Sequence, residues 1–239
     1  MGLLSSIKNM LAPTDHAYVL EGEVDWHSHL LPGVDDGVRT LSESLEILSS
    51  MERRGVREIW LTPHIMEDMP NTTTALKSVF KELTDAYEGS VRLHLASENM
   101  LDALFAERLK NSDFLPIGRN SDMLLVETSF YNPPSGLSDL LFSLRSVGLT
   151  PLLAHPERYR YMTEDDYRTL HSQGVRFQLN LMSLKGHYGP MAKVKARHLL
   201  NDGMYYCCGS DIHHKGHIPI LDGVSVRDGK NLAELRHRG

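Results

Sequence analysis

The sequence predicts a single α/β domain with parallel strands, and an α/β barrel suits its length. Apolar extended runs alternate with amphipathic helical stretches along the chain, a rhythm that is typical of parallel sheets. The chain has 239 residues, close to the ~250 residues that are typical of an α/β barrel. Its hydrophobic content of 41% and charged content of 23% are those of an ordinary globular protein, and no linker divides it.

Residues 1–22 form an extension before the first predicted strand. Apolar residues recur there at helical spacing, which predicts a short amphipathic helix that packs on the body or on a partner: Leu3, Leu4, Ile7, Met10 and Leu11. The extension has no apolar run long enough for a secretory signal, and no run in the chain approaches the ~20 residues that cross a bilayer. The sequence therefore favours a cytoplasmic protein without a transmembrane segment.

Seven extended runs are predicted as the strands of a main domain at residues 23–220. They are residues 23–29, 57–64, 91–98, 122–128, 150–158, 176–181 and 204–211. The first helix between them should begin at a capping box of Thr40 and Glu43 and end at Gly55. Later helices should also end at glycines, namely Gly89, Gly148, Gly174 and Gly203. The polar tail of residues 221–239 forms either a final helix or a disordered segment.

Almost every predicted strand ends in a side chain that can bind a metal. These residues are His27, His29, His64, Glu98, Glu127, His155, Asp211 and His213, whereas the sixth strand offers only Asn180. Because the carboxyl ends of parallel strands converge on one face of a barrel, we expect these side chains to lie together. A single histidine at a strand end is more often an ordinary structural residue. The repetition of the pattern predicts a metal centre.

The composition of this set indicates the chemistry of the centre. Imidazole nitrogens and carboxylate oxygens suit zinc, manganese or iron, and the set exceeds the needs of one ion. Ions ~3.5–4 Å apart favour phosphate ester hydrolysis by in-line displacement. The net charge of −6 argues against nucleic acid as a partner, so a phosphate group would depend on local positive charge. Adjacent Cys207 and Cys208 make a poor disulfide and fit a reducing compartment.

Several motifs in this order resemble one known superfamily. They are HSH at 27–29, LPGVDDG at 31–37, TPH at 62–64, LASE at 95–98, LVETSFYNPP at 125–134, LLAHPERY at 152–159 and GSDIHH at 209–214. Together they resemble the polymerase and histidinol phosphatase (PHP) superfamily, and within it most closely the CpsB/CapC branch. That branch contains bacterial metal-dependent protein tyrosine phosphatases of capsule and exopolysaccharide operons. The resemblance implies a distorted (β/α)7 barrel with three metal ions.

The resemblance also implies a role for each matched residue. One ion would be held by His27, His29, Glu98 and Asp211, a second by the shared Glu98 with Glu127 and His155, and a third by Asp36, His64 and His213. A hydroxide between the first two ions would attack phosphorus, and Arg158 would hold a phosphate oxygen. The family carries a second arginine shortly after the DxH motif. Here that stretch reads HHKGHIP, so His217, His214 or Lys215 would take its place, and we assign His217.

The function that the resemblance implies is hydrolysis of phosphotyrosine on a bacterial tyrosine kinase that controls polysaccharide export. Manganese is the expected metal, with iron, zinc, cobalt or magnesium as alternatives. A small-molecule phosphatase, such as one for histidinol phosphate, and a non-catalytic regulator that docks on a kinase are the competing hypotheses. A cysteine phosphatase is set aside, because no arginine lies six positions after Cys207 or Cys208.

Other polar residues are expected to have structural roles or none. Asp35 should cap the turn that follows it, and His94 should lie in the core or support the ligands. Tyr131 and Tyr159 serve either as packing residues or as a platform for an aryl ring. Solvent exposure is expected for His16, His171, His187, His198 and His237.

Overall fold

The strands form two parallel sheets that stand side by side. The computed structural model describes residues 18–229 and 231–236. The smaller sheet has the order β1 (Val24–Ser28), β2 (Glu58–Leu61), β4 (Arg92–Leu95). The larger has the order β3 (His64–Ile65), β5 (Glu98–Met100), β6 (Met123–Glu127), β7 (Thr150–Ala154), β8 (Arg176–Asn180), β9 (Tyr205–Gly209). The predicted single α/β domain with parallel strands is confirmed.

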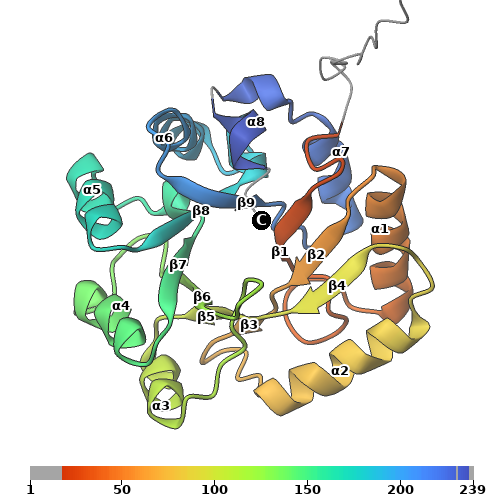
Figure 1. Ribbon diagram of the computed structural model, residues 1–239, viewed down its shortest axis with the longest axis horizontal. Coiled ribbons are helices and arrows are strands. Elements are labelled where there is room, and N and C mark those ends of the chain that lie inside the picture. The colour runs from red at the N-terminus through yellow and green to blue at the C-terminus, as the bar shows by residue number, and fades with distance from the viewer. Residues whose placement is uncertain (1–17, 230, 237–239) are drawn as a thin grey trace, which may run out of the picture.

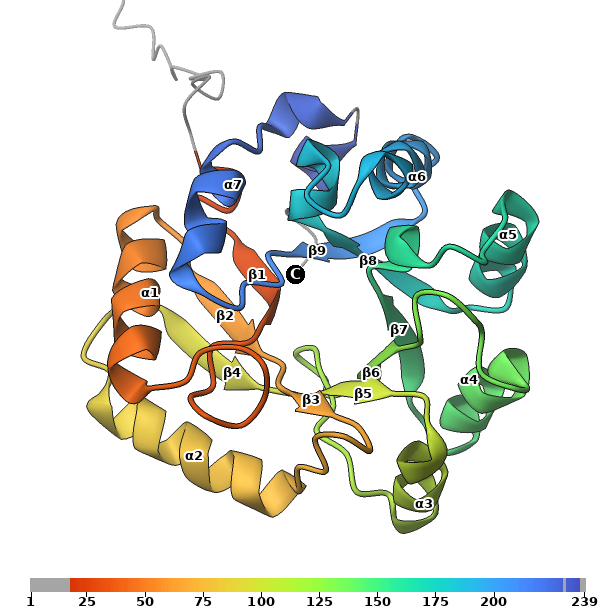
Figure 2. The same ribbon diagram turned by 180° about the vertical axis from the view of Figure 1, so that it is seen from behind.

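Helices surround the strands on the outside (Figures 1 and 2). They are α1 (Leu41–Arg53), α2 (Thr73–Ala86), α3 (Ala103–Asn111), α4 (Leu137–Ser146), α5 (Glu164–Ser172), α6 (Pro190–Asn201), α7 (Ile218–Asp222) and α8 (Leu232–Leu235). The two sheets meet where β1 approaches β9. There the Asp211 amide donates to the His27 carbonyl at 2.8 Å, and the His29 amide donates to the Ile212 carbonyl at 2.9 Å. This junction brings the first and last predicted ligand motifs together.

Two of the predicted strands are each divided, and their second halves join the other sheet. The run at residues 57–64 becomes β2 and β3, and the run at 91–98 becomes β4 and β5. Pro63 interrupts the first run, because proline has no N–H to donate to a strand ladder. The Glu98 amide then donates to the Pro63 carbonyl at 3.1 Å. As a result His64 lies opposite Glu98 in the β3–β5 pair.

The helix ends agree with the glycine pattern in most places. Gly55, Gly148, Gly174 and Gly203 follow helix ends with positive φ, as predicted. The prediction for Gly89 is wrong, because α2 ends at Ala86. The capping box at α1 is half correct. Thr40 accepts from the Glu43 amide, but the Glu43 carboxylate accepts from the Arg39 amide instead of that of Thr40.

The described part of the C-terminal tail packs on the body. Leu232 and Leu235 of α8 are buried in the main apolar core, and the Asn231 amide group donates to the Leu200 carbonyl at 3.0 Å. Arg236 reaches the Val19 carbonyl near the other end of the chain. The predicted amphipathic helix falls on residues 3–11, outside the described residues. Among the helices of the described ranges, none has the length and apolar character of a membrane span.

Candidate metal centre

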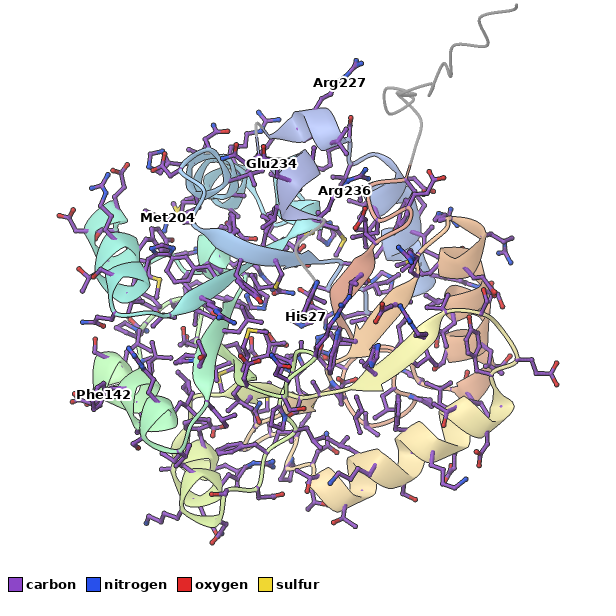
Figure 3. The ribbon with its side chains drawn as sticks, viewed as in Figure 1. His27, Phe142, Met204, Arg227, Glu234 and Arg236 are labelled. Carbon is purple, nitrogen blue, oxygen red and sulfur yellow. The ribbon has the colours of Figure 1, made fainter. Side chains whose placement is uncertain are left out.

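The predicted ligands gather at the carboxyl ends of the strands, where seven of the nine line one pocket and the buried His27 and His29 lie against them. Figure 3 shows His27 projecting from β1 towards the middle of the ring of strands. The pocket has a volume of about 460 Å³. Most of the predicted ligands are buried, whereas Asp36 is exposed and His213 is partly exposed at the rim. All of the predicted ligand side chains lie within this region, so the structure brings the whole set together.

The first group of donors surrounds Glu98 Oε2. His27 Nε2 lies 3.0 Å from His29 Nε2 and 3.1 Å from this oxygen. Asp211 Oδ1 lies 3.3 Å from His29 Nε2 and 3.5 Å from His27 Nε2. Ligand atoms bound at ~2.1 Å around one ion lie roughly 3.0–3.4 Å apart. These side chains are therefore spaced as ligands of a single small cation.

The second group lies around the other oxygen of Glu98. His155 Nε2 is 3.0 Å from Glu98 Oε1 and 3.9 Å from Glu127 Oε2. His64 Nδ1 is 3.0 Å from Glu127 Oε1 and 3.3 Å from Glu98 Oε2. Glu98 Oε1 thus faces His155, whereas Oε2 faces His27, His29 and His64. This geometry fits a carboxylate shared between two ions.

The third group gathers at the rim around Asp36. Its Oδ1 lies 3.6 Å from His64 Nε2 and 3.5 Å from His213 Nε2. His29 also approaches, with its ring centroid 4.0 Å from that of His213. His64 therefore faces the second group through Nδ1 and the third through Nε2. This double position is a detail that the assignment by resemblance did not contain.

Outer hydrogen bonds hold the two histidines of the first group in orientation. Asp35 Oδ2 is 2.8 Å from His29 Nδ1, and Gln178 Oε1 is 3.1 Å from His27 Nδ1. Such partners fix the tautomer and leave the other ring nitrogen for a metal. Asp35 also accepts from the Gly37 amide at 3.0 Å, so its predicted role as a turn cap is confirmed. Sequence reasoning missed Gln178, although it lies two residues before Asn180 and so on the same face of β8.

The backbone is strained at two of the strand ends. His155 has φ of 33° and Asp211 has φ of 53°, a left-handed conformation that non-glycine residues rarely adopt. Each costs about 1–3 kcal/mol and persists because the surrounding contacts hold it. The Asp211 backbone N–H donates a hydrogen bond to the His27 carbonyl, and the Arg158 backbone N–H donates to the His155 carbonyl at 2.9 Å. The strain turns both side chains into the pocket.

Charges in the cluster balance one another although they are buried. Burial disfavours the ionised carboxylate, but nearby His27 and His64 hold the pKa of Glu98 well below its usual range. Burial and the charge of His29 lower the pKa of His64, but the Glu98 and Glu127 carboxylates outweigh both and raise it to about 9. A divalent ion must therefore displace protons from the histidines in order to bind.

Arg158 lies beside the first group of donors. Its Nη1 donates to Asp211 Oδ2 at 3.0 Å. Its guanidinium carbon lies 4.2 Å from the ring centroid of Phe130 and 4.0 Å from that of Tyr188. The sequence reasoning did not single out Tyr188 or Phe130. Their rings fix the plane of the guanidinium at the wall of the pocket.

The stretch HHKGHIP, where the resemblance implies a second arginine, contributes histidines to the same wall. His214 and His217 line the pocket, whereas Lys215 is exposed and lies 3.6 Å from Glu46. His217 Nδ1 accepts from the His213 amide at 3.3 Å. Since a neutral ring then carries its proton on Nε2, His217 presents an N–H donor rather than an acceptor.

The other predicted polar residues take varied places. Tyr159 is buried and donates to the Ala154 carbonyl at 2.9 Å, so it is a packing residue, whereas Tyr131 is exposed. His94 is partly buried and pairs with Glu58. Exposure is confirmed for His171, His187 and His198, although His187 also lines the pocket. His16 and His237 fall outside the described residues.

The sequence matches one family model and several relatives. The model is described as capsular polysaccharide synthesis, CpsB/CapC, and it matches residues 23–222. The chain is 26% identical over 204 residues to a putative tyrosine-protein phosphatase CapC of Staphylococcus aureus, covering 83% of this chain and 80% of that one. It is 29% identical over 214 residues to the tyrosine-protein phosphatase CpsB of Streptococcus pneumoniae, covering 80% and 83%.

Solved structures share the fold. A crystal structure from a study of YwqE of Bacillus subtilis and CpsB of Streptococcus pneumoniae, described as metal-dependent tyrosine phosphatases, superimposes with a TM-score of 0.76 at 23% identity. It covers 88% of this chain and 86% of that one. An inactive dihydroorotase-like domain of Chaetomium thermophilum gives a TM-score of 0.54 at 14% identity, covering 91% and 77%. At these identities the likeness shows the fold alone.

Proposed function

We propose, from the premise that this chain belongs to the CpsB/CapC family of capsular polysaccharide synthesis proteins, that it is a metal-dependent protein tyrosine phosphatase. The observation that carries the proposal is the buried layer of donors around Glu98, whose Oε1 faces His155 and whose Oε2 faces three further histidines. A structural polar network would not need so many charged side chains in one layer, because each costs free energy to bury.

We propose that this layer of donors binds three divalent metal ions. Support comes from the three overlapping groups of donors, which are spaced as ligands. The set of imidazoles and carboxylates suits manganese, and it also accommodates iron, zinc, cobalt or magnesium. Divalent ions, when bound, supply a nucleophile from water at neutral pH and offset the charge of the phosphate.

The residues of the chain itself position the substrate in this proposal. Arg158 is mostly buried beside Asp211 and would donate to a phosphate oxygen. His217 would donate through Nε2 from the neighbouring wall, in place of the second family arginine. These donors, with the ions, would explain how a chain of net charge −6 holds a dianion.

The proposed substrate is phosphotyrosine in a protein, and the proposed partner is the tail of a bacterial tyrosine kinase in the cytoplasm. The relatives named as tyrosine-protein phosphatases support the first part. In this proposal residues 23–220 form the phosphatase domain, between an N-terminal extension and a C-terminal tail. The two sheets are then one distorted (β/α)7 barrel, which the hydrogen bonds between β1 and the residues after β9 support.

A hydrolysis assay with a metal screen tests the proposal. Phosphate release is measured from a phosphotyrosine peptide, the matched phosphoserine peptide and histidinol phosphate, with each metal in turn and with chelator. We expect metal-dependent release with the phosphotyrosine peptide preferred. Preference for histidinol phosphate would indicate a small-molecule phosphatase instead. No release from any substrate by protein with its full metal content would indicate a docking regulator.

A further inference from the structure

Two methionines each lie two residues after a predicted metal ligand at the end of a strand. Met66 follows His64 by two residues, and Met100 follows Glu98 by two residues. Side chains two apart on extended backbone point to the same face, about 6.6 Å apart. The β3–β5 pairing runs from His64 opposite Glu98 to Ile65 opposite Asn99, so Met66 and Met100 each follow this paired segment directly. Both methionines line the same pocket as His64 and Glu98, which places apolar side chains next to the donors.

A third methionine is held near Met66 by a tight turn. The Met66 amide donates to the Met69 carbonyl at 3.1 Å, and the Met69 amide donates to the Met66 carbonyl at 3.0 Å. The Asn71 side chain then donates to the carbonyls of His64 and Val34 at 2.9 and 2.8 Å. These bonds tie the turn to the strand that carries His64. The methionine side chains are thus placed in advance of any ligand.

Phe130 joins these methionines to the phosphate-binding wall. It lies three residues after Glu127, lines the same pocket, and contacts the guanidinium of Arg158 with one face. Its carbonyl accepts from the Arg160 amide at 2.8 Å, which fixes the loop. The pocket therefore has an apolar side and a polar side. The apolar side is made of Met66, Met69, Met100 and Phe130, and the polar side of Arg158, His187, His214 and His217.

We infer that Met66, Met69, Met100 and Phe130 form the subsite for the aryl ring of an aryl phosphate ester. This inference rests on the proposed function and names the residues that would contact the ring of its substrate. An aryl ring begins one bond beyond the ester oxygen, so a phosphate on the layer of donors places the ring about one step of the strand above it. Thioether sulfurs make favourable contacts with aromatic rings, and the phosphoserine side chain has no ring to make them.

Binding of two phosphonates to the manganese-loaded protein tests the subsite without turnover. Phenylphosphonate and methylphosphonate share the anionic group and differ in the ring, so the ratio of their dissociation constants by calorimetry reports the ring alone. We expect phenylphosphonate to bind more tightly to the wild type. In the double variant Met66→Gln, Met100→Gln the preference should fall about tenfold, with methylphosphonate binding and metal content unchanged. Both methionines are partly exposed, so glutamine is compatible with the fold.

Two further variants serve as controls. Met191→Gln changes an exposed methionine on α6 outside the pocket and should keep the wild-type preference. Met100→Leu keeps an apolar side chain at this position and should retain most of the preference for phenylphosphonate. Equal binding of the two phosphonates by the wild type, or an equal loss for both in the double variant, would overturn the subsite. Absence of phosphotyrosine hydrolysis with the phenyl preference intact would contradict the proposed activity while supporting the subsite.

Discussion

Replacing Arg158 with alanine should remove transition-state stabilisation without removing the metals. A phosphate paired with a mostly buried guanidinium loses about 2–5 kcal/mol when the arginine is truncated. This corresponds to a decrease in kcat/KM of about 30- to 5,000-fold. The decrease should lie near the upper end, because the second family arginine is replaced here by the HHKGHIP stretch. The kcat/KM of Arg158→Lys should lie between those of the wild type and Arg158→Ala. An ammonium keeps the charge but not the planar contact with Phe130 and Tyr188.

The structure explains why the metals should remain. Asp211 Oδ2 loses one donor in the alanine variant, but it still accepts from Asn180 at 2.7 Å and from Tyr188 at 3.3 Å. The assay compares kcat/KM for a phosphotyrosine peptide, metal content by mass spectrometry and circular dichroism. A comparable loss in His217→Ala would establish His217 as the second phosphate donor. Wild-type kinetics in Arg158→Ala would refute this reasoning, and loss of ions in proportion to activity would show that Arg158 acts through Asp211.

Three other outcomes are expected. Glu98→Gln should bind fewer ions and lose about 100-fold or more in turnover, because an amide neutralises two cations poorly. Its circular dichroism spectrum should be unchanged. Full metal content and full activity in this variant would show that Glu98 is not the carboxylate shared between two ions. Chelation should abolish activity, whereas thiol alkylation should not, since Cys207 and Cys208 are buried and burial raises the pKa of both thiols. Burial also raises the pKa of Asp25 to about 6, against hydrogen bonds that lower it, so between about pH 4 and 6 the folded protein keeps a proton that the unfolded chain has lost. The contribution of Asp25 to the free energy of unfolding therefore falls as the pH rises through that window. Measured by denaturant titration, the free energy of unfolding of Asp25→Asn should rise by about 2–3 kcal/mol relative to that of the wild type between pH 4 and 7. Parallel pH profiles of the two proteins would contradict this.

The convergence of the predicted ligands could be expected from the sequence because most of them follow a local rule. All except Asp36 lie at or just after the end of an apolar run, and the parallel arrangement that such runs imply brings them together. His27 and Glu98 are 71 positions apart in the sequence, yet their ligand atoms lie 3.1 Å apart. No knowledge of the packing is needed to expect that proximity.

Features that depend on tertiary pairing were not predictable in this way. The division at Pro63 depends on which sheet the next residues join, and the bond from Asp35 to His29 depends on how the turn folds back. Gln178 could not be predicted from the sequence, because a glutamine inside a strand does not by itself indicate a functional role. The double position of His64 follows from ring orientation, which packing decides.

The last short helix decides where this chain can be shortened. The family match ends at residue 222, but Leu232 and Leu235 are buried beyond it. Each buried leucine contributes about 1.5–3 kcal/mol, and domains of this kind have only about 5–15 kcal/mol of net stability. A protein cut at the family boundary would lose both leucines and expose the apolar surface that α8 covers beside β9. The segment needed for a stable fold is therefore longer than the segment that the family model matches. Fragments for expression or fusion should extend to at least residue 236.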